Sequence, residues 1–214
     1  MGRRAIPKAK APPSTVHHFR RLDDVETPLD VKALFARPDA PLEVEMGSGK
    51  GLFMSTASGD YPEHNFLGIE LAAKYAESAA QRLALQERDN AFMFQGDGVR
   101  LFREFLKDQS VHAVHVYFPD PWWKRKHHKR RILNESFLQD IVRMLVPAGR
   151  LHFWTDVEEY FEVSLALIAK VNELEGPLEV AEKAAEHPMD YRTHFERRMR
   201  MHNDPVYRSE FIKH

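Results

Sequence analysis

The stretch Pro41-Leu-Glu-Val-Glu-Met-Gly-Ser-Gly-Lys-Gly51 joins a short apolar strand to a turn that has glycine at every second position. Such glycines let the backbone approach a ligand closely and direct amide groups at it from the amino end of a following helix. We expect that helix to run through about Ser58. The spacing is G-x-G-x-G rather than the dinucleotide-binding G-x-G-x-x-G, so this turn alone is a weak indication of a cofactor site.

Segments with the character of strands and helices alternate along the rest of the chain. After the strand at 41–46, strands are expected at 65–70, 91–95, 111–118 and 149–155, with a possible strand at 178–181 and a last one at 205–212. Helices are expected over 71–88 and 134–146, in the apolar stripe from Val157 to Leu174, and over a short segment from Thr27 to Phe35. With a length of 214 residues and a hydrophobic fraction of 43%, this order predicts one large α/β domain.

Four successive predicted strands carry a carboxylate at or just past their carboxyl ends. These residues are Glu45, Glu70, Asp97 and Asp120. Open α/β sheets bind ligands beyond the carboxyl ends of their strands, and an acid after the second strand commonly holds a ribose diol through charge-assisted hydrogen bonds. Capping of the following helix is an alternative role for any one of these acids. Four in succession, the first beside the glycine turn, favour a crevice that binds a nucleoside.

The stretch Pro119-Asp-Pro-Trp-Trp-Lys-Arg-Lys-His-His-Lys-Arg-Arg131 combines an acid, two tryptophans and a basic run. Proline on both sides of Asp120 fixes φ and removes amide donors, so the loop cannot continue as a helix. An acidic tip beside aromatic side chains and positive charge suits an enzyme that acts on a base of a nucleic acid. A solvated charge run in a polar loop is the alternative. Trp122 and Trp123 are candidates for stacking on exposed bases, or for packing beneath the loop.

Charge is unevenly distributed, although 31 Lys and Arg against 32 Asp and Glu leave a formal net charge of only −1. Residues 1–21 contain Lys and Arg but no acid, and a third basic group lies at 192–200. These basic groups predict contact with phosphates. Because residues 1–26 also contain prolines and lack clear periodicity, we expect them to form a flexible basic arm before a domain that spans residues 27–214.

Composition excludes several kinds of site. The chain has no cysteine, which removes disulfides, zinc–thiolate sites and a thiolate nucleophile. His112 and His115 are expected to be hydrogen-bonded core residues, and the adjacent His127 and His128 lack metal-ligand spacing, so no metal is predicted. No apolar run approaches the roughly 20 residues that span a bilayer, and the amino-terminal segment has no signal-like apolar stretch. A cytoplasmic protein without membrane association is expected.

Six motifs taken together resemble those of the bacterial tRNA (guanine-N7)-methyltransferases, in the family's order and with similar spacing over about residues 42–212. They are Glu45-Met-Gly-Ser-Gly-Lys-Gly51, Leu67-Gly-Ile-Glu70, Gly96-Asp97, Pro119–Arg131, Trp154-Thr-Asp156 and Thr193-His-Phe-Glu196. The Pro-Asp-Pro-Trp block with its basic tail is the specific motif, whereas the glycine turn is not. Two positions depart from the family pattern: Trp123 fills a variable position, and Asn203 stands where a glycine is common.

The resemblance implies a Rossmann-like class I methyltransferase fold with a mostly parallel, doubly wound sheet and an antiparallel last strand. S-adenosylmethionine would be the methyl donor, and N7 of guanosine 46 in the variable loop of tRNA would be the acceptor. No metal and no obligate protein partner are implied.

The resemblance also implies roles for individual residues. Glu45 would lie by the methionine end of the donor, Glu70 would bind its ribose hydroxyls, and Asp97 would accept from its adenine amino group. Asp120 would be the catalytic residue. The residues implied for the donor are Glu45, Gly47, Gly49, Glu70, Asp97 and Asp120, and those implied for tRNA are Lys124, Asp156, Thr193, His194, Phe195 and Glu196. Asp156 has a second possible role as a cap of the helix that follows it.

Three other functions share some of these features. An NAD-dependent dehydrogenase would share the glycine turn and Glu70, but it leaves the Asp-Pro-Trp loop and its basic tail unexplained. An amino-group methyltransferase acting on adenine or cytosine has a similar Asp-Pro-Pro-aromatic loop, in which Trp122 here replaces the second proline. A catalytically silent RNA-binding protein of the same fold would not require the four strand-end acids.

Overall fold

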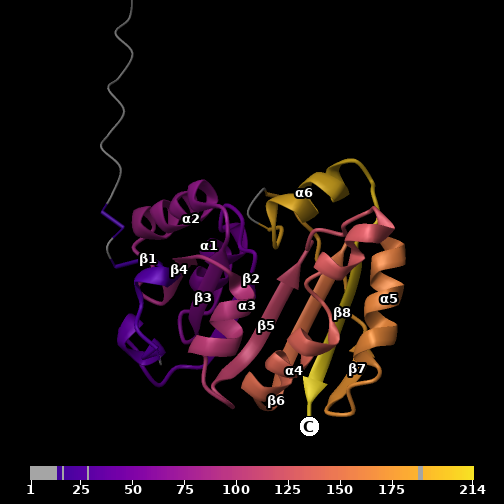
Figure 1. The fold of residues 1–214 in the computed structure, drawn as a ribbon. Helices are drawn as coiled ribbons and strands as arrows, with labels where there is room; N and C mark the ends of the chain where they lie inside the picture. Colours follow the sequence, from indigo (N-terminus) through magenta and orange to yellow (C-terminus); the bar gives the residue numbers. More distant parts are fainter. Residues whose placement is uncertain (1–13, 16, 28, 188–189) are drawn as a thin grey trace, which may run out of the picture.

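A computed structural model of the protein describes residues 14, 15, 17–27, 29–187 and 190–214. Eight strands form a single sheet in the order β1-β4-β3-β2-β5-β6-β8-β7 (Figure 1). The strands are β1 Phe19–Arg21, β2 Leu42–Met46, β3 Asn65–Glu70, β4 Ala91–Gln95, β5 Val111–Tyr117, β6 Leu145–Thr155, β7 Leu174–Leu178 and β8 Tyr207–Lys213. The helices are α1 Leu52–Asp60, α2 Ala73–Leu85, α3 Gly98–Arg100, α4 Glu135–Met144, α5 Glu158–Ile168 and α6 His194–Met201.

The strands from β1 to β6 are all parallel, whereas β8 is antiparallel to both β6 and β7. Strand order runs outward from β2 through β3 and β4 on one side, and then restarts with β5 and β6 on the other. The point between β2 and β5 is therefore the topological switch point, where open α/β sheets bind ligands. The predicted α/β class, with a mostly parallel sheet and an antiparallel last strand, is confirmed.

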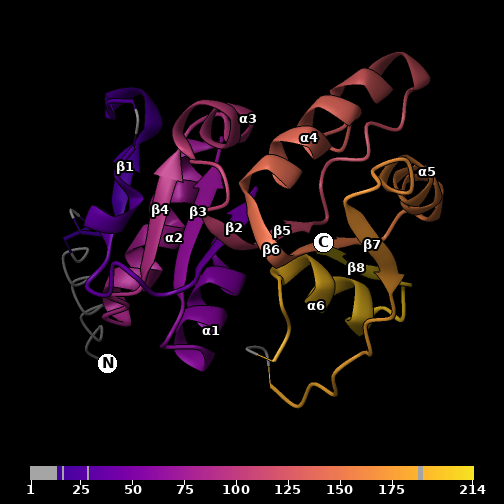
Figure 2. The ribbon, with the colours of Figure 1, turned by 90° about the horizontal axis from the view of Figure 1, so that it is seen from below.

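Helices cover both faces of the sheet (Figure 2). On one face α4, α5 and the turn of helix at Leu101–Phe105 pack on the larger apolar cluster, to which β2 contributes Leu42 and Val44. On the other face α1 and α2 pack on a second cluster that includes Phe53 and Ala80. Successive side chains of a strand alternate between faces, so Glu43 and Glu45 of β2 lie on the α1 side.

A buried polar group lies on the α1 side of the central strands. Glu43 Oε2 and His115 Nε2 are 2.7 Å apart, His115 Nδ1 lies 2.8 Å from the Tyr117 hydroxyl, and Glu43 Oε1 contacts His64. Burial raises the pKa of Glu43, but hydrogen bonds from His115 and His64 outweigh it and lower the pKa to about 2. Burial lowers the pKa of His115. A neutral His115 therefore donates through Nε2 to the Glu43 carboxylate and accepts the Tyr117 proton on Nδ1. His115 is a hydrogen-bonded core histidine as predicted, whereas His112 is exposed and accepts from the Leu42 amide.

The amino-terminal boundary of the domain differs from the prediction. Phe19–Arg21 pair with Met93–Gln95 as an edge strand, and Leu22, which follows them, is completely buried. The flexible arm expected through residue 26 is therefore wrong for residues 19–24, because Leu22 lies in the core and Phe19 packs against the second apolar cluster. Residues 1–13 and 16 of that arm lie outside the described residues.

Three other elements also differ from expectation. The segment from Thr27 to Phe35 contains only a 3-10 turn at Val31–Leu34, and Pro28 lies outside the described residues. The strand expected at 178–181 forms earlier, as β7, where it pairs with β8. Helix α4 ends at Met144 and leads directly into β6.

Asn203 adopts φ +56°, so an asparagine supports the left-handed turn after α6. Within the described ranges, none of the helices has the length and apolar character needed to cross a bilayer.

Replacing Leu22 with alanine tests whether this segment belongs to the core. Because Leu22 is fully buried, Leu22→Ala is expected to lower the free energy of unfolding by about 2–4 kcal/mol, measured by urea denaturation. Leu85→Ala is a matched control, since Leu85 is 71% exposed. Equal, negligible effects of the two substitutions would mean that residues 19–24 do not contribute to the fold.

Candidate active site

The glycine turn after β2 faces open space. The amides of Gly47 and Ser48 donate to the Ile69 carbonyl of β3 at 2.9 and 3.0 Å, which fixes the turn against its neighbouring strand. Gly47 and Gly49 have φ of +74° and +52°, and a Cβ added to either would meet no atom within 4 Å. The backbone conformation thus favours glycine at both positions, and the space in front of them is available to a ligand.

Two of the four strand-end acids organise the loops in which they lie. Glu70 accepts hydrogen bonds from the Gly49 amide at 2.9 Å and from the Ala72 amide at 2.8 Å, so its carboxylate joins the glycine turn to the start of α2. Asp97 accepts from the Val99 amide at 2.8 Å and caps α3. Asp97 therefore caps a helix, which was the alternative role considered for these acids. Each oxygen of Glu70 and Asp97 that accepts one of these bonds retains a further lone pair for a ligand.

Glu45, at the end of β2, is only 3% exposed, and Oε2 of its carboxyl has no hydrogen-bond partner within the described part of the chain. Burial, with a smaller contribution from the negative charge of Glu70, raises the pKa of Glu45 to about 8. The carboxyl is therefore largely protonated at neutral pH in the free protein. An unpartnered carboxyl at this depth is suited to a cationic ligand group, which would favour its ionised form.

The loop that carries Asp120 is held in an unusual conformation. Phe118 and Trp122 both have φ +48°, which is uncommon for aromatic residues and costs on the order of 1–2 kcal/mol each. The Phe118 amide donates to the Trp154 carbonyl at 2.8 Å, and its ring lies 5.0 Å from that of Phe195 in α6. Asp120 is exposed, and its Oδ1 accepts from the Trp122 amide at 2.9 Å. Its carboxylate is thus fixed at the carboxyl end of β5 and accessible from solvent.

The two tryptophans have different environments. The Trp122 ring is half-buried, with the Arg130 guanidinium 4.9 Å and the His127 ring 5.9 Å from its centre. Trp123 is 71% exposed. Trp122 therefore packs within the loop, and Trp123 alone of the pair presents its indole to a partner.

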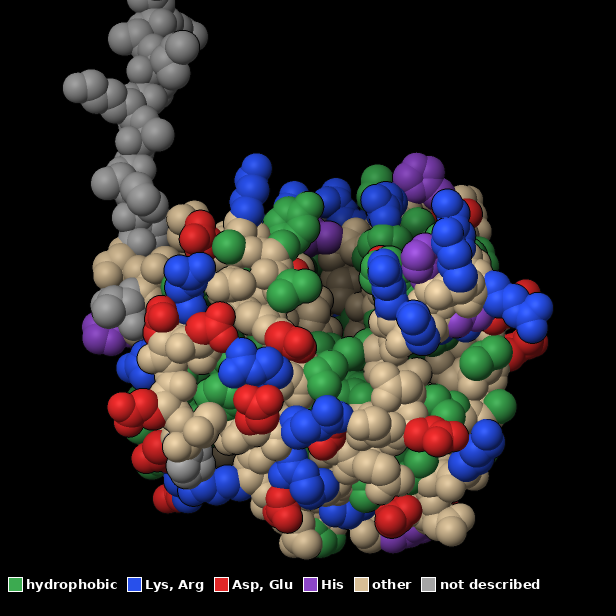
Figure 3. All heavy atoms as spheres, in the orientation of Figure 1, with side chains coloured by type: hydrophobic (Ala, Val, Ile, Leu, Met, Phe, Trp, Pro, Cys, Tyr) green, Lys and Arg blue, Asp and Glu red, His purple; other side chains and the backbone are tan. Residues whose placement is uncertain are grey.

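The basic run forms a 3-10 turn at Arg125–Arg130. Of the six Lys and Arg residues from Lys124 to Arg131, the first five along the chain are exposed and the last, Arg131, is buried. Figure 3 shows a hollow at the top of the molecule with Lys and Arg side chains on both sides of it. Lys and Arg side chains therefore lie on both sides of an opening in the surface.

The Thr193–Glu196 segment begins α6 and stabilises its first turn. The Thr193 hydroxyl caps the helix by accepting from the Glu196 amide at 3.0 Å, and Glu196 Oε2 accepts from the Arg192 amide, one residue before the cap, at 2.7 Å. Glu196 is 3% exposed and also pairs with Arg208. His194 Nε2 lies 3.5 Å from an Arg82 guanidinium nitrogen of α2. Thr193 and Glu196 thus have structural roles whatever else they contact.

Asp156 is half-buried at the end of β6. Helix α5 follows Val157, and no side chain caps its first turn. The Val157 amide donates to the Thr155 hydroxyl at 3.2 Å and not to Asp156. The helix-cap alternative for Asp156 is therefore wrong.

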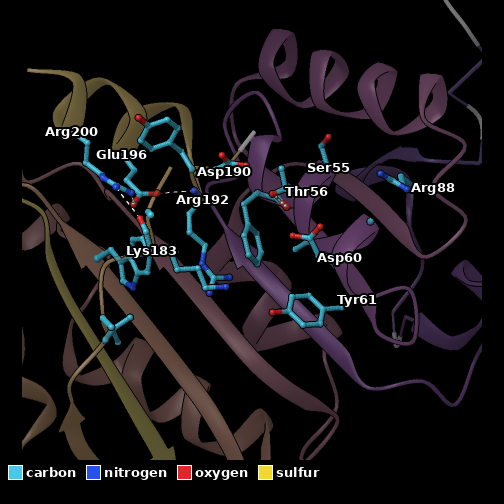
Figure 4. A pocket seen from close by; sticks show the side chains of 18 residues that line it. Ser55, Thr56, Asp60, Tyr61, Arg88, Lys183, Asp190, Arg192, Glu196 and Arg200 are labelled. Atoms are coloured by element: carbon cyan, nitrogen blue, oxygen red, sulfur yellow. Dashed lines mark hydrogen bonds and ion pairs between the residues drawn. The ribbon is translucent and has the colours of Figure 1, made fainter. Parts of the chain in front are cut away.

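Arg192 is a residue whose position the sequence did not predict. Its guanidinium lies 5.6 Å from the ring centres of both Phe53 and Trp154, and its positive charge acts to lower the pKa of Glu45. It points into a cavity of about 530 Å³ between α1 and the segment that precedes α6 (Figure 4). Neither the glycine turn nor Asp120 lines this cavity. The sequence placed Arg192 only in the third basic group, as a phosphate contact, and gave no indication that it would lie against Phe53 and Trp154.

Comparison with known proteins agrees with the motifs. The family described as "Putative methyltransferase" matches residues 39–209. A tRNA (guanine-N(7)-)-methyltransferase of Rhodopirellula baltica is 49% identical over 192 residues, which cover 87% of this chain and 70% of that protein. The chain belongs to this family of methyltransferases. A second member, a tRNA (guanine-N(7)-)-methyltransferase of Syntrophotalea carbinolica, is 33% identical over 177 residues, covering 80% of this chain and 75% of its own.

Solved structures support the class I methyltransferase fold. The 30S ribosomal A1408 methyltransferase from an uncultured bacterium superposes with a TM-score of 0.53 at 16% identity, covering 86% of this chain and 91% of that one. At this identity the likeness concerns the fold alone. The family match leaves the dehydrogenase alternative without support, because the glycine turn and Glu70 are equally features of a methyltransferase of this family.

Replacing Glu45 with glutamine tests the protonation of this buried carboxyl. A pKa raised from 4.5 to about 8 means that the contribution of Glu45 to stability is fully present below pH 4.5 and is lost progressively as the pH rises to about 8. Relative to Glu45→Gln, the unaltered protein should lose stability as the pH rises from about 4.5 to about 8, by at most about 1.4 kcal/mol per pH unit, with little further loss above that, measured by urea denaturation without ligands. Parallel pH profiles of the two proteins would show that Glu45 is ionised throughout.

Proposed function

We propose that this protein transfers a methyl group from S-adenosylmethionine to N7 of guanosine 46 in tRNA. The observation that carries the proposal is the fixed, exposed Asp120 carboxylate, which lies between an open glycine turn and a basic run in a chain of this family. The named activity of the relatives, tRNA (guanine-N(7)-)-methylation, supports the same substrate.

The residues around the glycine turn fit the methyl donor. The unpartnered Glu45 Oε2 suits the ammonium group of the methionine part, and the free space at Gly47 and Gly49 accommodates its close approach. Glu70 holds its loops through one bond per oxygen, which leaves each oxygen able to accept from a ribose hydroxyl. Asp97, just past the end of the next strand, would accept from an adenine amino group.

The chemistry requires alignment more than proton transfer. The donor supplies an electrophilic methyl group on a sulfonium, which becomes a neutral thioether as the methyl carbon bonds to guanine N7. N7 has a free lone pair, so no general base is needed, and positive charge spreads over the purine as the bond forms. Asp120 stabilises that charge and accepts hydrogen bonds from the guanine N1–H and amino group. Its prior bond to the Trp122 amide reduces the reorganisation needed.

The tRNA would be held on the same side of the molecule. Lys124 and the exposed members of the basic run contact phosphates, and Trp123 stacks on an unpaired base. Asp156 and the Thr193–Glu196 segment complete the contacts to the nucleotide, with His194 and Phe195 supplied from the first turn of α6.

A methyl-labelling experiment tests this function. Unmodified tRNA is incubated with donor carrying a tritiated methyl group, digested, and separated into nucleosides. The label is expected in 7-methylguanosine, and a tRNA with adenosine in place of guanosine 46 is expected to remain unlabelled. Label in an N-methylated adenosine or cytidine would instead support the amino-group methyltransferase.

Replacing Asp120 with asparagine separates a catalytic role from a donor-binding role. Asp120→Asn keeps the shape but removes the charge that stabilises the purine, so the single-turnover rate is expected to fall about 10²-fold. The dissociation constant of the donor, measured by calorimetry, should change less than about twofold. Equal losses in rate and donor affinity would place Asp120 in the donor pocket.

Replacing Trp123 with alanine tests base stacking. Trp123→Ala is expected to weaken tRNA binding by about 1–3 kcal/mol, measured by filter binding at fixed salt. Leu85→Ala removes an equally exposed apolar side chain, 71% exposed in both cases, from the far end of α2 and should leave binding unchanged. If Trp123→Ala binds tRNA as the unaltered protein does, Trp123 does not stack on the RNA.

A further inference from the structure

The last residue of the basic run behaves differently from the others. Arg131 is 6% exposed, whereas Arg130 directly before it is exposed and lies over the Trp122 ring. Sequence alone assigns both arginines to the same phosphate-binding surface. Their opposite environments separate Arg131 from the exposed part of the run.

Contacts with four residues hold the Arg131 guanidinium in place. Nε donates to the Pro121 carbonyl at 2.8 Å, and Nη1 and Nη2 donate to the two carboxylate oxygens of Glu159 at 3.2 and 2.7 Å. Nη2 also lies 3.3 Å from His128 Nε2, and the guanidinium carbon lies 4.6 Å above the Tyr160 ring. The charge is paired, and most of its N–H donors are used within the protein.

These contacts join the Asp120 loop to a rigid element. Pro121 is the residue after Asp120, and Glu159 and Tyr160 lie in the first turn of α5. The same loop contains two aromatic residues at φ +48°, a conformation that persists only where surrounding contacts impose it. As proline donates no amide bond, the Pro121 carbonyl is the backbone group through which the loop can be anchored at this residue.

We propose that Arg131 is a positioning residue for methyl transfer, which fixes the Asp120 carboxylate by holding the Pro121 carbonyl against α5, and that it is not a phosphate contact. This inference rests on the proposed function of Asp120. A displacement of about 1 Å at a reacting group can lower a rate about a hundredfold, so loosening this anchor should affect turnover while leaving tRNA affinity intact.

Arg131→Lys is the first test, because lysine keeps the charge but cannot hold Pro121 and Glu159 together through a planar fork. The single-turnover rate with saturating donor and tRNA is expected to fall at least tenfold. The dissociation constant for tRNA and its dependence on salt should match those of the unaltered protein. Arg130→Gln is the matched comparison: it should weaken tRNA binding and reduce the slope of log K against log salt by about one.

Glu159→Gln is the second test, and it disturbs the same anchor from an exposed side chain, 57% accessible, with less risk to folding. It should also lower the bound-state rate, by a smaller factor, without shifting the urea midpoint. The double variant Arg131→Lys with Glu159→Gln should be no slower than Arg131→Lys alone, because both act on one network. Either an unchanged rate in Glu159→Gln or additive losses of the two substitutions in the double variant would overturn the proposal.

Amide exchange gives a readout that does not depend on the RNA substrate. Hydrogen–deuterium exchange of a peptide that contains Trp122, whose amide is bonded to Asp120, should speed up in Arg131→Lys and not in Lys129→Gln, which alters an exposed side chain of the same run. Unchanged exchange, or a loss of tRNA affinity and salt slope equal to that of Arg130→Gln, would show that Arg131 is another phosphate contact. If the unaltered protein methylates no tRNA but this exchange difference is present, the proposed function fails while the anchoring contact stands.

Discussion

Every part of the candidate site depends on β2 lying between two parallel neighbours, β3 and β5. Parallel pairing brings the carboxyl ends of these strands to one edge, so that residues from distant parts of the sequence converge there. Glu45 pairs with Gly68 of β3 and His115 of β5, two residues before the ends of those strands. From this register Glu70 reaches back to the glycine turn, and the Asp120 loop begins one residue past β5. An antiparallel strand at either position would direct one of these loops to the opposite edge.

The two glutamates of β2 show how strongly local partners decide the state of a buried carboxyl. Glu43 and Glu45 lie on the same face of the same strand, and burial raises the pKa of each. Glu43 has two histidine partners, and its pKa falls to about 2, whereas Glu45 has no comparable partner and its pKa rises to about 8. The first carboxylate belongs to a satisfied structural network. The Glu45 carboxyl lacks such partners, and a bound cationic group would supply one, as expected of a ligand-binding residue.

Much of this arrangement could be predicted from the sequence, because strand periodicity, the glycine turn and the strand-end acids are local signals. The strands from β2 to β6 and the last strand lie close to their expected positions, and the motifs led to the family that the comparisons identify. What could not be predicted depends on tertiary contacts. Phe19–Arg21 has no apolar alternation, and it is held by pairing with β4 and by the packing of Phe19 and Leu22. Arg130 and Arg131 are identical residue types whose different burial follows from the path of the loop, and Thr193 and Glu196 have structural roles that the motif alone does not distinguish from substrate contact.

The strands at the two ends of the sheet bear on the solubility of the protein. An outermost strand exposes backbone donors and acceptors with which a strand of another molecule can pair, and such pairing leads to aggregation. Here β1 has three residues, two of them arginines, and β7 has five residues, among them Pro177, which has no amide hydrogen to donate. Neither end therefore offers a long, uncharged run of free hydrogen-bonding groups. These short, interrupted borders protect an eight-stranded sheet from growing by addition of further chains.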